Sequence, residues 1–154
     1  MIDPATIATF RQRYNQCFAC GEANPVGLHI DPIIPTGADG VEATFRPRPE
    51  FAGFDKTLHG GVISTALDEI SAWSVMVGAG KLVFTATLDL RFRKPASTES
   101  TFLLRGRLVE RRGRRFAVEA EMLDGDTVVA SSKGVFVEAF DMDRIPEPGV
   151  QSPD

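Results

Sequence analysis

One segment of the chain carries side chains whose types and spacing could do chemistry together. His59-Gly60-Gly61 precedes a long stretch with helical periodicity, and Asp68 follows nine residues after the histidine. Successive glycines let a ligand approach the backbone, and the first N–H groups of a helix are unpaired donors at the positive end of its dipole. These residues predict an oxyanion site at the helix start and a carboxylate base or nucleophile on the same helix.

A strand that follows the helix could complete this site. Residues 82–93 alternate with a period of two, and Pro95 ends the pattern. We expect Val83, Thr85 and Arg91 to share the more polar face, where Thr85 offers a hydroxyl. The end of the strand offers three cations that could meet phosphate groups: Arg91, Arg93 and Lys94.

Each of these features also has a simpler interpretation. His59-Gly60-Gly61 could be a flexible entry to a helix, and Asp68 and Glu69 could be solvated residues of an ordinary surface helix. Cations at a strand end are common on soluble proteins. The combination of an oxyanion donor, a carboxylate, a hydroxyl and cations favours the chemical interpretation over these separate ones.

The elements that would position these residues follow from periodicity and turn signals. Asp3 before Pro4 predicts an N-cap and a helix to about Tyr14. Alternating patterns predict strands at 27–30, 41–46, 82–92, 102–111, 116–123 and 128–138, and His59-Gly60-Gly61 opens the long helix, which Gly78 and Gly80 end. This order predicts an α+β fold, with one antiparallel sheet wrapped around a long central helix and a short N-terminal helix.

The length of 154 residues fits one domain. We expect it to span residues 1–140, of which 1–26 form the N-terminal helix and a covering loop. The Pro-rich residues 141–154 predict a disordered tail. No stretch approaches eighteen apolar residues, and the N-terminus lacks the basic-then-apolar layout of a signal peptide. These features predict a cytoplasmic protein without a membrane partner.

Charge is unevenly distributed along the chain. The net charge is −4, yet ten of the seventeen Lys and Arg residues lie between Lys81 and Arg115, with only three acids among them. Binding to a polyanion needs a broad positive face, whereas one basic segment on an acidic chain suits an anionic small ligand. We therefore expect no nucleic-acid partner.

The long helix itself predicts a subunit interface. From Val62 to Val77 its only charges are Asp68 and Glu69. Around Asp68, opposite the apolar stripe, lie small uncharged residues: Ser64, Ser71 and Val75. Because Glu and Lys are typical of a solvated helix face, this face predicts cover by a second subunit. We expect a homodimer or a dimer of dimers.

Two cysteines, Cys17 and Cys20, have the spacing of zinc ligands. A tetrahedral zinc site needs four ligands, and only His29 and His59 could add to them, the latter assigned to the helix start. A thioredoxin-like redox role would place the pair near a βαβ unit, which the pattern lacks. Packing of the covering loop is the favoured interpretation, and we expect no metal and no cofactor.

These motifs resemble the hotdog-fold acyl-CoA thioesterases of the PaaI-like, 4-hydroxybenzoyl-CoA thioesterase superfamily. His-Gly-Gly-Val-Ile-Ser-Thr-Ala-Leu-Asp-Glu, from His59, is similar to the signature helix start, and residues 85–95 are similar to the central strand. Cys17-Phe-Ala-Cys20-Gly, followed by Asn24-Pro-Val-Gly-Leu, resembles a lead-in of some members. The resemblance spans about residues 17–137.

The resemblance implies a role for each residue. The Gly60 N–H, at the start that includes Gly61, would hold the thioester carbonyl oxygen, and His59 would help to orient that carbonyl. Asp68 of a partner subunit would act as base or nucleophile, and Thr85 would position the water. Some members carry Asn six residues before the histidine, where this chain has Gly53.

Acyl-CoA thioester hydrolysis is therefore the expected activity, with coenzyme A as part of the substrate. Two alternatives remain open at this point. A hotdog acyl-thioester dehydratase could use His59 and Asp68 as its acid/base pair. A non-catalytic acyl-CoA binding module would need neither residue for chemistry. A DNA-linked sensor would carry an added helix-turn-helix segment, and the pattern contains none.

Overall fold

A computed structural model of the chain describes residues 2–144. Its elements run from the N-terminal helix to a short terminal turn: α1 (Pro4–Arg13), β1 (Ile33–Thr36), β2 (Gly40–Phe45), η1 (Pro49–Phe51), β3 (Ala52–Phe54), β4 (Thr57–Leu58), α2 (Gly60–Ala79), β5 (Lys81–Phe92), β6 (Phe102–Arg112), β7 (Arg115–Asp124), β8 (Thr127–Asp141) and η2 (Met142–Arg144). The predicted long helix and last four strands are confirmed to within a few residues.

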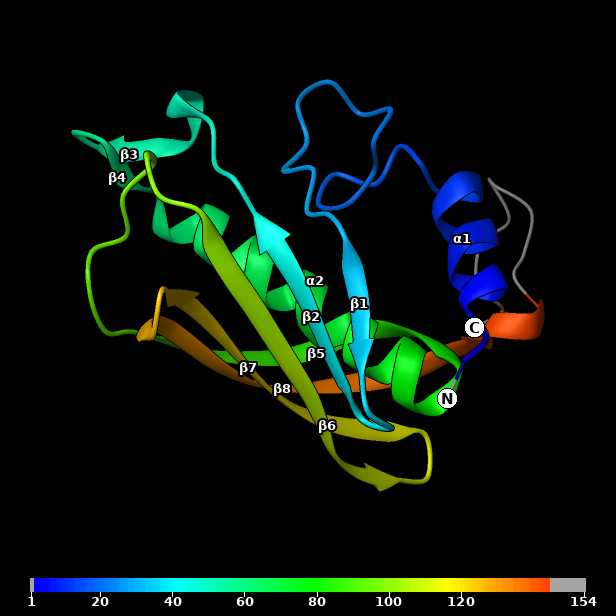
Figure 1. The fold of residues 1–154 in the computed structure, drawn as a ribbon. Coiled ribbons are helices and arrows are strands. Elements are labelled where there is room, and N and C mark those ends of the chain that lie inside the picture. Colours follow the sequence, from blue (N-terminus) through cyan, green and yellow to red (C-terminus); the bar gives the residue numbers. More distant parts are fainter. Residues whose placement is uncertain (1, 145–154) are drawn as a thin grey trace.

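Six strands form one antiparallel sheet that curls around α2 (Figure 1). Their order is β1-β2-β6-β7-β8-β5, and β3 and β4 form a separate small hairpin. Strand β5 is an edge strand: in the described part of the chain it pairs with β8 alone. The predicted α+β architecture is confirmed.

The core lies between α2 and the concave face of the sheet. Trp73, Leu67 and Ile70 of α2 are fully buried, as are Phe45 of β2 and Phe102 of β6. A second cluster joins Val75 of α2 to three residues of β7 and β8: Phe116, Val118 and Phe136. Side chains of this size supply most of the apolar area that stabilises the domain.

Much of the small-residue face of α2, for which we expected cover by a second subunit, is already covered within one chain. Ser71 and Val75 are both buried within the single chain. The sheet curls far enough for β6 and β7 to cover this side of the helix. The absence of charges there reflects packing inside one subunit, so it carries no information about a second one.

The N-terminal region differs from the predicted hairpin. Asp3 caps α1 by accepting a hydrogen bond from Ala5 N at 3.2 Å, as expected. Residues 27–30 form no strand, because Leu28 N donates to Phe18 O and Ile30 N donates to Ala19 O. These bonds fold the covering loop back on itself, and the first strand, β1, begins only at Ile33.

A β-bulge changes which face each residue of β5 occupies. The pairing of β5 with β8 shifts register between Thr85 and Thr87. One extra residue reverses the alternation beyond it, so Thr85 shares the helix-facing side with Leu88 rather than with Thr87. The predicted strict alternation along this strand is therefore wrong beyond Thr85.

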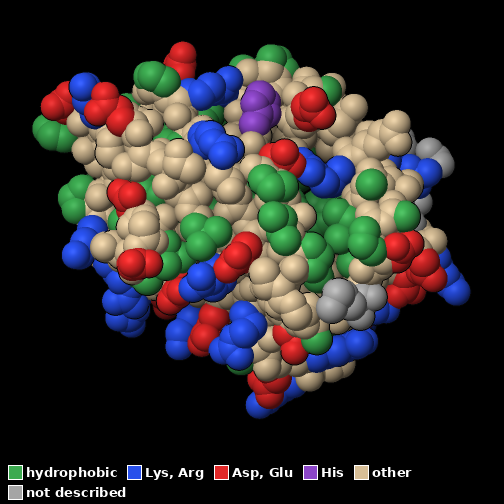
Figure 2. Space-filling view, viewed as in Figure 1, with side chains coloured by type: hydrophobic (Ala, Val, Ile, Leu, Met, Phe, Trp, Pro, Cys, Tyr) green, Lys and Arg blue, Asp and Glu red, His purple; other side chains and the backbone are tan. Residues whose placement is uncertain are grey.

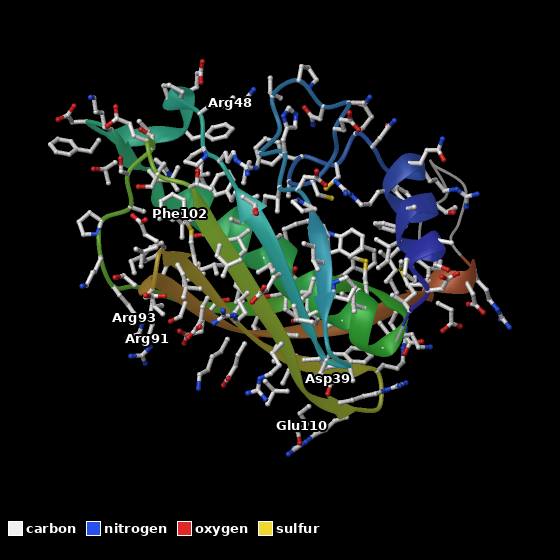
Figure 3. All side chains as sticks on the ribbon, viewed as in Figure 1. Asp39, Arg48, Arg91, Arg93, Phe102 and Glu110 are labelled. Carbon is white, nitrogen blue, oxygen red and sulfur yellow. The ribbon has the colours of Figure 1, made fainter. Side chains whose placement is uncertain are left out.

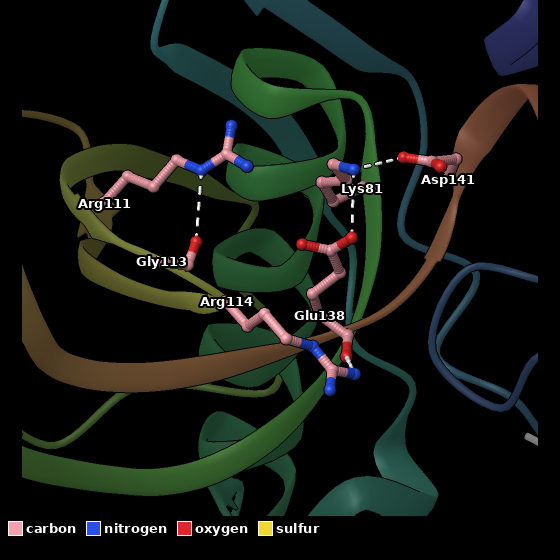
Figure 4. A network of polar contacts seen from close by, with 6 residues as sticks. All are labelled: Lys81, Arg111, Gly113, Arg114, Glu138 and Asp141. Atoms are coloured by element: carbon pink, nitrogen blue, oxygen red, sulfur yellow. Dashed lines mark hydrogen bonds and ion pairs between the residues drawn. The ribbon is translucent and has the colours of Figure 1, made fainter. Parts of the chain in front are cut away.

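The end of the domain lies later than predicted. Asp141 is the last residue of β8, and Met142 is buried. Lys81 forms ion pairs with Asp141 and with Glu138, the latter at 2.9 Å (Figure 4). Arg114 Nη2 also donates to the Glu138 carbonyl oxygen at 3.0 Å. Residues 141–144 are thus part of the fold, and the rest of the predicted tail, 145–154, lies outside the described residues.

Gly106 of β6 marks the closest approach of α2 to the sheet. A Cβ atom at this position would lie 2.8 Å from Ile70 O and still closer to the Ser74 hydroxyl. We expect Gly106→Ala to lower the free energy of unfolding by about 1–3 kcal/mol, because the helix backbone must move away from the sheet. Arg107→Ala, at an exposed neighbouring position, is the matched control. Urea unfolding of both variants measures the difference, and equal stability would contradict the predicted close contact.

Candidate active site

The start of α2 leaves one backbone donor free. His59 is the N-cap, and its Nδ1 accepts from Gly61 N–H at 2.8 Å. The His59 carbonyl oxygen accepts from Val62 N and Ile63 N. Among the residues that the structure describes, no acceptor lies within hydrogen-bond distance of Gly60 N–H. Of the residues at this helix start, Gly60 is therefore the one whose N–H can serve a ligand.

The surroundings of Gly60 are open enough for an approaching group. A Cβ atom there would meet only the Phe92 ring of β5, at 3.5 Å. Gly53 of β3 packs against His59, where its Cβ would lie 3.0 Å from the imidazole Cδ2. A side chain at position 53 would therefore press on the histidine that caps α2.

Asp68 and Thr85 of the same chain lie together in the structure. Thr85 Oγ1 donates to Asp68 Oδ1 at 2.6 Å, which joins the middle of α2 to the edge strand β5. Asp68 is half-buried and Thr85 is exposed. A carboxylate held by a neighbouring hydroxyl at a solvent-accessible edge is a suitable base for a water molecule.

Gly60 and Asp68 of one chain cannot serve one substrate. They are eight residues apart on the same helix, which is about 12 Å along the axis at 1.5 Å per residue. A carbonyl oxygen and the water attacking its carbon must lie within about 3–3.5 Å of each other. The two halves of the predicted site are therefore separated within the chain.

Glu69, next to Asp68, belongs to a different environment. Its Oε1 accepts from Trp73 Nε1 at 2.9 Å, and it lies beside Cys17 and Cys20 of the covering loop. Burial raises the pKa of Glu69 to about 7. This contact could not be predicted from the sequence. The loop and the helix are distant along the chain, and no pattern within either segment indicates that Glu69 approaches the two cysteines.

The two cysteines are electrostatically unequal. A hydrogen bond with the Cys20 thiol and N–H bonds from the loop backbone lower the pKa of Cys17 to about 5. The same thiol hydrogen bond, with burial and the nearby Glu69, raises the pKa of Cys20. Cys17 is therefore the thiolate of the pair.

Several cations of the basic segment are paired with acids. Arg105 pairs with Glu42 at 3.0 Å, and Arg112 pairs with Glu110 at 2.8 Å. Figure 2 accordingly shows Lys and Arg side chains interspersed with Asp and Glu along the lower part of the molecule rather than one continuous basic face. The expectation that this segment does not coat a polyanion is consistent with that distribution.

The predicted phosphate-binding residues are exposed at the end of β5. Arg91 and Arg93 extend away from the ribbon beside each other (Figure 3), and Arg93 Nε donates to Ser131 Oγ at 3.3 Å. Within residues 2–144, neither these two nor Lys94 forms an ion pair. The three cations are thus available to an anion.

A wide cleft of the described chain lies away from Gly60 and Asp68. It has a volume of about 920 Å³ and is bounded by α1, the covering loop and β2, through residues that include Arg11, Asn15, Cys20, His29 and Arg46. Neither half of the predicted site lines it.

This chain belongs to the thioesterase superfamily, whose family model matches residues 55–131. The match includes the start of α2, Asp68 and most of the wrapped sheet. An uncharacterized mitochondrial protein of Candida albicans is 30% identical over 72% of this chain and 54% of its own length. The acyl-coenzyme A thioesterase THEM4 of Bos taurus is 24% identical over 89% of this chain and 57% of its own length. The chain thus spans about half the length of these curated relatives.

Solved structures confirm the hotdog fold. A thioesterase superfamily protein has a TM-score of 0.75 at 24% identity, covering 80% of this chain and 61% of its own. The PaaI protein of the E. coli phenylacetic acid degradation operon has a TM-score of 0.73 at 17% identity, covering 88% and 94%. Smu.793 of Streptococcus mutans, solved with acetyl CoA, has a TM-score of 0.66 at 20% identity, covering 73% and 90%.

One further observation bears on the membrane. Across residues 2–144, neither helix combines the length and the apolar character needed to cross a bilayer.

The geometry of His59 predicts a stability effect that is separate from chemistry. Because its Nδ1 caps α2, His59→Ala should lower the free energy of unfolding by about 0.5–2 kcal/mol. His59→Asn restores a side-chain oxygen that can accept from Gly61 N–H and should recover most of that loss. Thermal unfolding of the two variants makes the comparison. An unchanged melting temperature for His59→Ala would show that the cap contributes no stability.

Proposed function

We propose that the protein hydrolyses an acyl-CoA thioester to a free acid and coenzyme A. The observation that carries the proposal is the hydrogen bond between Thr85 and Asp68, which holds a carboxylate at the solvent-accessible edge of the sheet. Membership of the thioesterase superfamily and the named activity of the bovine relative support it. The acetyl CoA bound to the Streptococcus mutans structure supports coenzyme A thioesters as the ligand class.

The proposed reaction uses three groups of the chain: the Asp68 carboxylate, the Thr85 hydroxyl and the Gly60 N–H. Asp68 takes a proton from a water molecule that Thr85 orients, and the water oxygen attacks the thioester carbonyl carbon. The negative charge that develops on the carbonyl oxygen is stabilised by Gly60 N–H, which is the free donor of the helix start. Collapse of the intermediate breaks the carbon–sulfur bond, and the thiol leaves with the proton. In the alternative route, Asp68 attacks the carbonyl carbon as a nucleophile with the same oxyanion donor, and the thiolate leaves. Water then hydrolyses the mixed anhydride to the free acid, which restores the Asp68 carboxylate, and the thiolate takes up the proton. Neither route uses a metal or a cofactor.

His59 has a supporting role in this proposal. With Nδ1 accepting from Gly61 N–H, the proton of the neutral imidazole is on Nε2, which can donate toward the thioester. Gly61 is thereby committed to the cap, so its own N–H is not the oxyanion donor. The proposal assigns that donor to Gly60 alone.

We further propose that each site forms between two subunits of a homodimer, or of a dimer of dimers. The separation of Gly60 from Asp68 along α2 means that the partner subunit must supply one of them. The unpaired edge strand β5 carries Phe84 and Phe92, which are 58% and 55% exposed. Apolar side chains on an open edge are suited to an interface between copies of the chain.

The anionic end of coenzyme A needs cations near this edge. Arg91, Arg93 and Lys94 are exposed at the end of β5 without ion-pair partners among the described residues, so we propose that they meet its phosphates. We keep the cytoplasm as the proposed location, although the Candida albicans relative is named as mitochondrial.

The reaction can be tested by measuring thiol release from a panel of acyl-CoA thioesters, since only hydrolysis frees coenzyme A. Asp68→Asn should lower kcat/KM by about 10²–10⁴-fold, because the amide cannot accept the proton. The near-isosteric amide can still accept from Thr85, so the fold should remain. Asp39→Asn, the same change at an exposed acid in the turn between β1 and β2, is the matched control and should keep the activity. Wild-type turnover by Asp68→Asn would overturn the assignment.

The shared site predicts complementation between two inactive variants. Gly60→Ala should fold, since the added methyl meets only the Phe92 ring, but should lose about 10²-fold or more in kcat/KM as the carbonyl is kept from its donor. Unfolding and refolding it together with Asp68→Asn creates mixed dimers in which one of the two sites has both groups intact. Random pairing should restore about a quarter of the wild-type activity.

A lack of recovery in the mixture, with dimers present, would place both groups in one subunit. Light scattering on the wild type should report at least twice the chain mass of 16.7 kDa at micromolar concentration. A monomer would contradict the shared site outright.

A further inference from the structure

We propose that Cys17, Cys20 and Glu69 bind a zinc ion that fastens the covering loop to α2. This site is distinct from the proposed catalytic groups and independent of the proposed reaction. The sequence predicted no metal, because only histidines were considered as ligands in addition to the two cysteines. The structure adds Glu69 to the candidate ligands.

The distances within the cluster suit one ion. The two Sγ atoms and a carboxylate oxygen of Glu69 all lie within 4.8 Å of one another. With Zn–S bonds of about 2.3 Å and Zn–O bonds of about 2.1 Å, a tetrahedral ion holds its ligand atoms about 3.6–3.8 Å apart. A contraction of about 1 Å or less, within reach of side-chain rotation, closes the site around the ion.

The loop backbone is shaped to hold a thiolate pair. The loop turns tightly at the first cysteine, where Gly21 N–H donates to the Cys17 carbonyl oxygen at 2.9 Å. Gly21 leaves no room for a side chain, since its Cβ would collide with the backbone of Asn15 and Cys17. This turn places both Sγ atoms on the side of the loop that faces α2, close to the Glu69 carboxylate.

Charge also favours a cation at this position. Three groups that bind a metal ion in their anionic forms, Cys17, Cys20 and Glu69, lie at one point, and Asp68 is the next residue to Glu69 on α2. The Glu69 carboxylate accepts a hydrogen bond from the neutral Trp73 Nε1 at 2.9 Å, and within residues 2–144 it forms no ion pair. A divalent ion would offset this concentration of negative charge and release the remaining thiol protons to solvent.

The ligand chemistry selects zinc among common ions. Thiolates bind soft and borderline metals and discriminate against Mg²⁺ and Ca²⁺, while one carboxylate is compatible with zinc. Three protein ligands leave a fourth position for a water molecule. Cys20 lines the 920 Å³ cleft beside α1, so the ion and its water can enter from that side.

A bound ion would connect two segments that are far apart in the sequence. The covering loop contacts the core through Ala19 and Cys20, and the ion would add a bond from this loop to the middle of α2. Glu69 is adjacent to Asp68, so the loop, once fastened, would also stiffen the helix turn that carries the proposed base. The role of the ion is therefore structural.

The test uses the full chain without a histidine tag, reduced, freed of metal with a chelator and kept anaerobic. Titration with Zn²⁺ should reach about one equivalent per chain and raise the melting temperature. Co²⁺ should give the near-ultraviolet charge-transfer band of thiolate ligands. Cys17→Ser and Cys20→Ser should each lose that band and the thermal shift, and Glu69→Gln should weaken Zn²⁺ binding by about tenfold or more.

Two controls separate this result from general effects. Glu22→Gln removes an exposed acid that lines the same cleft and should bind Zn²⁺ as the wild type does. Asp68→Asn should also keep stoichiometric zinc, so a failure of the proposed hydrolysis leaves this result unaffected. Substoichiometric zinc in the reduced wild type, or equal binding by Glu69→Gln and the wild type, would overturn the proposal. A Cys17–Cys20 disulfide that persists in the chain under reducing conditions would overturn it as well.

Discussion

The burial of α2 inside the curled sheet is the constraint on which the other features of this molecule depend. Strand β6 can approach the helix because Gly106 faces Ile70 and Ser74 without a side chain. That approach lets the sheet cover both flanks of the helix, including Ser71 and Val75. Polar atoms in this interface are satisfied locally, since the Ser71 and Ser74 hydroxyls donate to carbonyl oxygens one turn earlier. The helix is left with few positions at which a charged side chain can reach solvent or a ligand.

Two adjacent acids occupy those positions and face different parts of the molecule. Successive residues on a helix differ by about 100° in direction, so Asp68 can reach the edge strand β5 while Glu69 reaches the covering loop. Thr85 donates to the first carboxylate, and Trp73 donates to the second. The difference in burial gives them different chemistry. An accessible carboxylate suits proton transfer with water, whereas a shielded one beside two sulfurs suits a cation.

The sequence was most informative where a pattern persists over many residues. The 20-residue helix and the strands of 10–15 residues after it have enough periods to define their type and limits. Residues 27–30 alternate over only four positions, and the loop hydrogen bonds of Leu28 and Ile30 override that short signal. The bulge near Thr85 is set by pairing with β8 and leaves no mark on the alternation itself. Local sequence patterns therefore predicted which segments form helices and strands better than they predicted which side of each strand a residue occupies.

The contacts of the two acids on α2 also differ in how far the sequence could predict them. The approach of Thr85 to Asp68 could be predicted, because a helix and the strand that follows it are joined by a tight turn at Gly80 and must pack against each other. The approach of Glu69 to Cys17 could not, since it depends on how a loop without regular structure folds over the helix. With histidines as the only further candidates, the CxxC pair lacks the ligands that a zinc site needs. In the folded chain, Glu69 of α2 lies beside the pair and offers a third ligand. Contacts between distant segments are fixed by packing, and packing is not encoded in any single stretch.

The length of α2 explains why an oligomer would be a chemical requirement rather than an addition to the fold. A single buried helix presents its free N–H at its first residue and its accessible carboxylate two turns later, where β5 forms the open edge. Two copies that pair across the open edge in antiparallel orientation can bring the start of one helix to the middle of the other. The edge strand that would be a liability in a monomer then becomes the element that joins the two halves of the site.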